Sequence, residues 1–396
     1  MIFWPRPWTS LLSDSNSGKR GAWYLANIAN FLCLGCHLAS TLLPLYWKQC
    51  NFLDQQIGWL AAGFSTTAIL TRPSLGRGLE RWGRKPFLLL GAVLLTLPAG
   101  LYSWAGDDYS YWAILRLLQG AGLGCYIPAI LTWVADMSPP DKIGEMQGIF
   151  GVSGLIGSAV GPWSAELVYK NFGFTSMFQA LCGAGVCCLI LLCLLPESRK
   201  SDNKAGAKAR SKIAVSEHKA MLWVTLPFGW FVGTVLTFIA PFLKQIDLPK
   251  VGLYFASFAA ASVCVRVFAS QAIDKTKANT LVFCSGSSLV LSGFILSALA
   301  YYDNQVLLIT AAIFNGLGHG FLFPCLSSHT VKKTSAQQRG AGLSLFTGAF
   351  DLGILLGALA SGYIAHHTSY SMAISVGSVL LFISLPVFSW HNKERA

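Results

Sequence analysis

Asp351 stands in the middle of a long apolar run, flanked by Phe350 and Leu352. A charge inside a bilayer costs roughly 2.5–3.5 kcal/mol on insertion scales, so a carboxylate at this position needs a physical account. Ser344 and Thr347 precede it at helical spacing, which places the three side chains on one face of a helix. We expect Asp351 to bind a proton or a cationic solute. The alternative is a structural acid bonded to a neighbouring helix.

Two further ionisable side chains lie inside apolar runs. Arg116 is about two turns into its run with Gln119 one turn further on, and His319 lies among glycines. Arg116 either extends its charge outward to the interface or stays buried, where a guanidinium binds anions. A histidine titrates near neutral pH and binds polar ligands, whereas a lone one is often a packing residue. Both alternatives stay open for each residue.

A polar stripe runs along the first apolar segment. Asn27, Asn30, His37 and Thr41 fall within about 80° of one another at helical spacing, so this face points away from lipid. The stripe lines a cavity or makes hydrogen bonds between helices. Further candidates for a cavity wall are Tyr126, Trp230 and Asn315.

Composition sets the class of protein. Of the residues, 54% are hydrophobic and only 12% are charged, and the mean hydropathy is +0.53. Such a chain lacks the polar residues to cover a soluble surface, and its apolar runs of about 20 residues indicate a multi-pass membrane protein. The net charge of +12 lies in loops, so we expect no nucleic-acid partner. The eleven cysteines lack metal or redox spacing, and we find no enzyme signature, metal cluster or cofactor motif.

The expected fold is all-α, with twelve transmembrane helices in two pseudo-symmetric six-helix bundles. A basic cytoplasmic linker at residues 197–218 separates a bundle at 1–196 from a bundle at 219–396. With both termini inside, about 23 of the 29 Lys and Arg residues are cytoplasmic, as the positive-inside rule requires. The spans are expected near 22–46, 57–75, 86–104, 110–135, 142–168, 173–195, 219–243, 249–272, 279–300, 305–330, 339–364 and 369–389.

The two halves of the sequence are related to each other. Residues 119–124 (QGAGLG) followed by Pro128 match residues 315–320 (NGLGHG) followed by Pro324. At the same offset, the glycine pair at 157 and 161 matches the pair at 353 and 357, and Arg72 matches Arg266 at a slightly shorter offset. Internal repeats of this kind are typical of transporters, which bind substrate near the midplane between the repeats.

A short segment between two apolar runs carries a specific resemblance. Residues 76–85 are packed with glycine and charge, and Arg72 precedes them as one more cation of this group. The segment resembles the loop between helices 2 and 3 of the major facilitator superfamily, with Glu80 in place of the usual Asp. In that family the motif closes the cytoplasmic side, its acid bonding a helix end of the other half, where the helix dipole favours an anion. The implied gating residues are Gly76, Glu80, Arg81, Gly83 and Arg84.

Three more patterns are similar to the same family. Residues 116–124 resemble its helix-4 motif, and Arg339-Gly340 with residues 350–353 resemble its drug:proton and sugar-efflux-like branches. A helix-5 antiporter motif is formed by Gly148, Gly157, Gly161 and Pro162. Small residues at this spacing let helices approach closely. The usual glycine pair at the end of this motif is replaced by Ala165 and Glu166, and Glu166 lies near a span end, where snorkelling or a gate contact accounts for it.

The resemblance implies a secondary transporter that works by alternating access. The first hypothesis is proton-coupled efflux of a small organic solute by antiport; the second is proton-coupled or facilitated uptake, and the third a lipid-flipping or receptor-like protein. No cofactor is expected beyond a proton gradient, and we expect a monomer in a bacterial cytoplasmic membrane. The expected proton-coupling residues are Asp351 and Arg116. The expected substrate-binding residues are Asn30, His37, Arg116, Gln119, Tyr126, Trp230, Asn315, His319 and Asp351.

Overall fold

The computed structural model describes residues 17–138, 143–198, 218–268, 276–302, 304–332 and 339–393. Every regular element in these ranges is a helix, so the all-α prediction is confirmed. The elements are α1 (Ser17–Ala39), the 3-10 turn η2 (Ser40–Leu42), α2 (Leu43–Gln49), α3 (Asp54–Trp82), α4 (Lys85–Ala105), α5 (Tyr109–Met137), α6 (Ile143–Leu194), α7 (Lys219–Gln245), α8 (Val251–Phe268), α10 (Ala278–Ala298), α11 (Gln305–Lys332), α12 (Arg339–His367) and α13 (Tyr370–Lys393).

The helices are long enough to form membrane spans. Among the described residues, nine helical stretches have the length and apolar composition to cross a bilayer, and Val251–Arg266 is a shorter apolar helix. The long α6 is interrupted at Gly173, whose φ of 82° is non-helical, so α6 consists of a first part (143–172) and a second part (174–194). With α3 these segments match the twelve expected spans in order, although the count of twelve membrane crossings stays a prediction.

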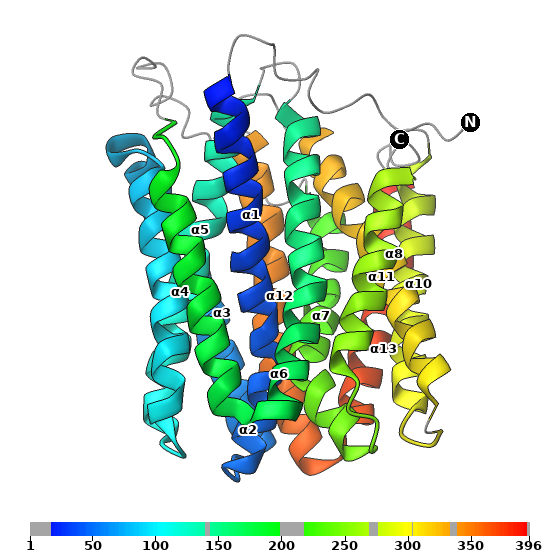
Figure 1. Ribbon diagram of the computed structural model, residues 1–396. Coiled ribbons are helices and arrows are strands. Elements are labelled where there is room, and N and C mark those ends of the chain that lie inside the picture. The colour runs from blue at the N-terminus through cyan, green and yellow to red at the C-terminus, as the bar shows by residue number, and fades with distance from the viewer. Residues whose placement is uncertain are drawn as a thin grey trace, which may run out of the picture.

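The helices stand side by side in one bundle (Figure 1). At one end lie the start of α1 and the turn between α3 and α4; at the opposite end α2 runs into the start of α3. We call the first the loop end and the second the mouth end. The loop end is uppermost in Figure 1. By the distribution of Lys and Arg, the loop end is expected on the cytoplasmic side.

Helix packing repeats between the two parts of the chain. In residues 17–198, α1 packs along α6 and α3 along α5; in residues 218–393, α7 packs along α12 and α8 along α11. The most extensive contacts between these parts are those of α3 with α12 and of α6 with α8, and α2 also packs against α7. We refer to residues 17–198 and 218–393 as the first and second halves; the exact domain boundaries stay a prediction.

Glycine pairs allow the closest of these approaches. A Cβ atom added at Gly157 or Gly161 would lie 2.3 or 2.0 Å from a backbone carbonyl oxygen of α1. A Cβ atom added at Gly353 or Gly357 would lie 2.3 Å from a carbonyl oxygen of α7. The close approach expected of the helix-5 glycines is therefore present, and it recurs at the matching positions of the second half. Gly148 belongs to α6, but its surroundings lie outside the described residues.

Candidate functional site

A cavity of about 140 Å³ lies between the two halves. Its walls come from α1 with η2 and α2, from α3 and α5, and from α7 and α12. Polar or aromatic side chains on these walls are His37, Ser40, Thr41, Trp47, Phe64, Ser65, Arg72, Arg116, Thr237 and Asp351. The structure thus brings together three of the predicted site residues, Asp351, Arg116 and His37, which lie on three different helices. Their predicted roles in binding stay predictions.

Arg72 and Asp351 form an ion pair across this cavity. Arg72 belongs to α3 and Asp351 to α12, so the pair joins the two halves through oppositely charged groups. The side chains are 30% and 19% exposed, so neither is fully buried. The sequence places Arg72 in the expected span 57–75, just before the 76–85 segment, but does not predict a site role for it; α3 continues to Trp82, so Arg72 lies well inside the helix. The signal that could have identified it is its match to Arg266 in the repeat.

Arg116 is buried in the wall of the cavity and does not extend to the interface. Its guanidinium donates a hydrogen bond of 2.9 Å from Nη1 to Oε1 of Gln119. The guanidinium carbon also lies 4.5 Å from the ring centroid of Phe64 and 5.9 Å from that of Trp47. Among the described side chains, none of the ion pairs involves this arginine. The positive charge is therefore stabilised by an amide oxygen and two aromatic faces.

His37 faces the same cavity from α1. Its ring stacks on Phe64, with the ring centroids 5.1 Å apart and the planes 15° from parallel. Phe64 thus contacts both the His37 ring and the Arg116 guanidinium. Aromatic side chains were expected on the wall, but Phe64 and Trp47 were not predicted, because a single aromatic residue in an apolar span carries no positional signal of its own.

Two predicted amide side chains, one in each half, do not line this cavity and contact neighbouring helices of their own half. Asn30 of α1 donates a 3.0 Å hydrogen bond from Nδ2 to Oγ of Ser153 in α6. Asn315 of α11 donates a 2.5 Å hydrogen bond from Nδ2 to the hydroxyl of Tyr254 in α8. Both side chains are buried. For Asn30 this is the hydrogen bond between helices that the sequence left open as an alternative to cavity lining, and the predicted substrate contacts of both amides stay predictions.

Three other predicted side chains also lie away from this cavity. Tyr126 is fully buried in the hydrophobic core of the first half. The backbone of Trp230 is the surface of α7 against which the α12 glycines pack. The ring of His319 lies among three phenylalanine rings, with centroid distances of 5.4–6.0 Å. Their predicted substrate contacts have no support in this arrangement and stay predictions.

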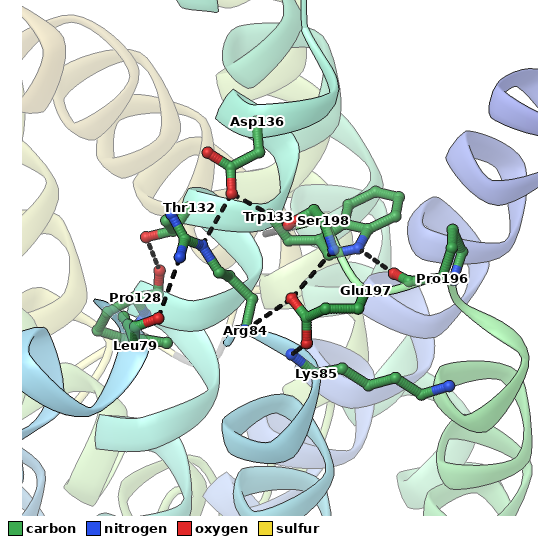
Figure 2. A network of polar contacts seen from close by, with 10 residues as sticks. All are labelled: Leu79, Arg84, Lys85, Pro128, Thr132, Trp133, Asp136, Pro196, Glu197 and Ser198. Carbon is green, nitrogen blue, oxygen red and sulfur yellow. Dashed lines mark hydrogen bonds and ion pairs between the residues drawn. The ribbon is translucent and has the colours of Figure 1, made fainter. Parts of the chain in front are cut away.

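The loop end of the first half carries a polar network (Figure 2). Arg84 pairs through Nε with Asp136 of α5 at 2.8 Å and donates from Nη1 to the Leu79 carbonyl oxygen at 3.0 Å. The Glu197 carboxylate accepts from the backbone N–H groups of Arg84 at 2.9 Å and Lys85 at 3.0 Å. Glu197 therefore caps the start of α4 with a negative charge, where the helix dipole favours one.

Gly83 has the backbone conformation that this network requires. Its φ is 90°, and a Cβ atom there would lie 2.6 Å from Oε2 of Glu197. Arg84 and Gly83, both predicted gating residues, thus contact residues of their own half. Gly76, Glu80 and Arg81 have side chains or surroundings outside the described residues, so the predicted latch to the other half is untested. The sequence assigns Glu197 to the linker; only the fold brings it to residues 83–85.

The halves are also joined at the mouth end. Asp54, the first residue of α3, pairs with Lys48 Nζ at 2.8 Å and accepts a 2.5 Å hydrogen bond from the Tyr370 hydroxyl of α13. Gly58 and Gly362 support this contact, since a Cβ atom at Gly58 would lie 2.7 Å from a carbonyl oxygen of α12. The central cavity is therefore bounded on this side by direct contacts between the halves.

A bundle of apolar helices with a charged cavity between two related halves defines a membrane transporter. The family model described as Major Facilitator Superfamily matches residues 24–337 and 288–395, and the chain belongs to this family. It is therefore a multi-pass membrane protein of a transporter family.

Similar proteins fit this membership. The chain is 21% identical to "Multidrug resistance protein 2" of Bacillus subtilis (strain 168), over 91% of this chain and 93% of the relative. It is 25% identical to "Multi-drug resistance efflux pump PmrA homolog" of Lactococcus lactis subsp. lactis (strain IL1403), over 90% and 91%. The solved structure titled "Crystal structure of nucleoside transporter NupG" shares the fold with a TM-score of 0.75 at 13% identity, over 94% of this chain and 99% of that one.

Proposed function

We propose that this transporter exports a small organic solute in exchange for protons. The observation that carries the proposal is the Arg72–Asp351 ion pair, a titratable contact between the two halves inside the central cavity. The names of the relatives, which describe multidrug resistance and an efflux pump, support export as the direction.

The pair supplies a way to couple protons to movement of the halves. A proton bound to Asp351 removes the negative charge, so Arg72 loses its ionic partner and the contact between α3 and α12 weakens. A cationic solute bound at Asp351 competes with both the proton and Arg72. Proton and solute therefore bias the two arrangements of the halves differently, which any coupled transport requires.

The test uses inside-out membrane vesicles with the cationic dye ethidium as probe. Acidifying the vesicle interior by respiration imposes the gradient that drives antiport. The expected result is dye accumulation that requires this protein and stops when an uncoupler collapses the proton gradient. Accumulation that persists unchanged after uncoupling would contradict proton coupling, and accumulation of the dye only in the opposite membrane orientation would contradict export.

A second candidate, proton-coupled uptake of an organic anion, is favoured by the charges of the cavity. Its described lining holds two arginines, Arg72 and Arg116, against one carboxylate, Asp351. Protonation of Asp351 would free Arg72 for an anion, so proton and anion would bind together. The anionic dye fluorescein, offered to right-side-out vesicles at low external pH, separates the two candidates. Accumulation of fluorescein without ethidium export would replace the first proposal by the second.

We also propose that both chain ends face the cytoplasm in a bacterial cytoplasmic membrane, and that the protein acts as a monomer. The supporting observation is that about 23 of the 29 Lys and Arg residues fall in the segments that the sequence predicts to be cytoplasmic under the positive-inside rule. Protease treatment of right-side-out vesicles should spare an epitope tag at either terminus. Cleavage of the tag in intact vesicles would contradict this orientation.

A further inference from the structure

We propose that Glu166 is a gate residue that holds the mouth end closed and must release each time this end opens. Glu166 stands where the family's helix-5 motif usually has a glycine, so the residue is a departure from that pattern. It lies in the first part of α6, in the first half, and is buried. One of its two partners, Gly252, lies at the start of α8 in the second half, and the other, Lys170, lies on α6 itself.

The contacts of Glu166 cross directly between the halves. Its Oε2 atom accepts a hydrogen bond from the backbone N–H of Gly252, the second residue of α8. Its Oε1 atom pairs with Lys170 Nζ at 2.7 Å, one turn further along α6. Lys170 Nζ also donates to the carbonyl oxygen of Pro249 at 2.5 Å. We call these contacts the Glu166 clasp.

The position of the Glu166 carboxylate at the start of α8 strengthens the contact between the halves. The first four N–H groups of a helix have no partner within the helix, and the positive end of the helix dipole lies there. The Glu166 carboxylate satisfies one of these groups with a charge-assisted hydrogen bond, which is about twice as strong as a neutral one. Since this partner belongs to the other half, the bond exists only while α6 and α8 are close at the mouth end.

The packing around Gly252 allows the close approach that its hydrogen bond to Glu166 requires. A Cβ atom added at Gly252 would lie 2.6 Å from Cα of Trp163 and 3.0 Å from Oε2 of Glu166. The first obstacle is backbone, so any larger residue at position 252 would push α8 away from α6. Glycine at this position lets the N–H group approach the carboxylate, and Glu166 and Gly252 therefore act as a pair.

The hydrogen bond from Tyr370 to Asp54 closes the same end elsewhere, between α13 and α3. Loss of the Glu166 clasp alone is therefore expected to shift the balance toward an open mouth end without opening it permanently. For function, Glu166 therefore shifts the conformational equilibrium toward the arrangement in which the cavity is closed at the mouth end.

The test measures access to the cavity from the mouth-end side of the membrane. Thr237 lines the cavity on α7, and Thr237→Cys provides a thiol for a membrane-impermeant maleimide applied to vesicles of either orientation. Labelling is taken relative to the same chain without this cysteine, which accounts for the native thiols. Glu166→Ala and Gly252→Ala should each raise the labelling rate from the mouth-end side about tenfold, as expected for loss of a hydrogen bond to a charged group.

Two further variants separate the clasp from a general loosening. Glu166→Gln keeps an acceptor oxygen but loses the ion pair with Lys170, so a smaller increase is expected. Lys250→Ala removes a contact with Gln305 at the same end but within the second half, and it should leave labelling unchanged. Unchanged labelling in both Glu166→Ala and Gly252→Ala, with folded protein recovered, would overturn the proposal. So would an equal increase in Lys250→Ala. The assay uses neither substrate nor proton gradient, so its outcome is independent of the proposed antiport.

Discussion

Replacing Asp351 by Asn is the most direct test of the cavity ion pair. Asn keeps the shape of the side chain and an oxygen that accepts a hydrogen bond from Arg72, but it carries no charge and cannot take up a proton at neutral pH. The variant therefore resembles the protonated state of Asp351 permanently. Transport should lose its dependence on the proton gradient while the fold is retained.

The size of the effect follows from how exposed the pair is. Exposed pairs contribute about 0–1 kcal/mol, whereas breaking a buried pair costs about 3–5 kcal/mol. With side chains 30% and 19% exposed, Arg72 and Asp351 lie between these limits, and the hydrogen bond that Asn retains reduces the loss to about 1–2 kcal/mol. Since 1.4 kcal/mol corresponds to tenfold, the ratio of separated to closed α3–α12 contacts should rise about five- to thirtyfold.

The assay is dye transport in inside-out vesicles, with and without the proton gradient, at equal amounts of folded protein judged by size exclusion. Ethidium accumulation by the Asp351→Asn variant should be the same in both conditions. Asp107→Asn is the matched control, because Asp107 is an exposed aspartate in the turn between α4 and α5 and should behave as wild type. Gradient-dependent accumulation of undiminished size in the Asp351 variant would remove this residue from the coupling mechanism.

Three further predictions concern the supporting structure. Gly161→Ala should lower the free energy of unfolding by about 1–3 kcal/mol or more through overpacking against α1, and sharply lower the yield of folded protein. Gly183→Ala is the control, because no neighbouring atom lies within 4 Å of the added Cβ, and its yield should not fall. Equal yields of the two variants would contradict the packing argument. Glu197→Ala removes the cap of α4, worth about 1 kcal/mol, and should speed hydrogen exchange in the first turn of α4, so protection equal to wild type would count against the cap. Arg116→Gln removes a buried charge that has no acidic partner among the described side chains, and the desolvation cost that is relieved should offset the lost contacts with Gln119, Phe64 and Trp47, so the apparent melting temperature should stay unchanged or rise; a clear drop in a thermal-shift assay would show that these contacts outweigh the desolvation cost.

Some features of the site could be predicted from the sequence. Asp351 and Arg116 stand out because a charge inside an apolar span is costly and therefore rare. The glycine pair at 157 and 161 stands out by its spacing and by its repeat at 353 and 357, since close helix packing leaves a periodic pattern of small residues. These signals are local, and each can be recognised without knowing which helix is the neighbour.

Other features depended on the fold. Arg72 is separated from Asp351 by 279 positions, and nothing in either local sequence indicates that α3 and α12 bring them together. The amides of Asn30 and Asn315 are equally suited to a cavity or to a neighbouring helix, and the packing of α1 on α6 and of α8 on α11 decides for hydrogen bonds between helices. Glu166 is an ordinary residue near a span end until the start of α8 is placed beside it.

Composition, the order of apolar runs and the distribution of cations were thus sufficient for the class of protein, the all-helical fold and the internal repeat. The reason is that lipid imposes length, polarity and charge rules on each span separately. Pairings between charges depend on which helices become neighbours and on how each is rotated, and these are properties of the packed bundle. Only the tertiary structure, therefore, decided that Asp351 faces Arg72 and that Glu166 reaches across to the other half.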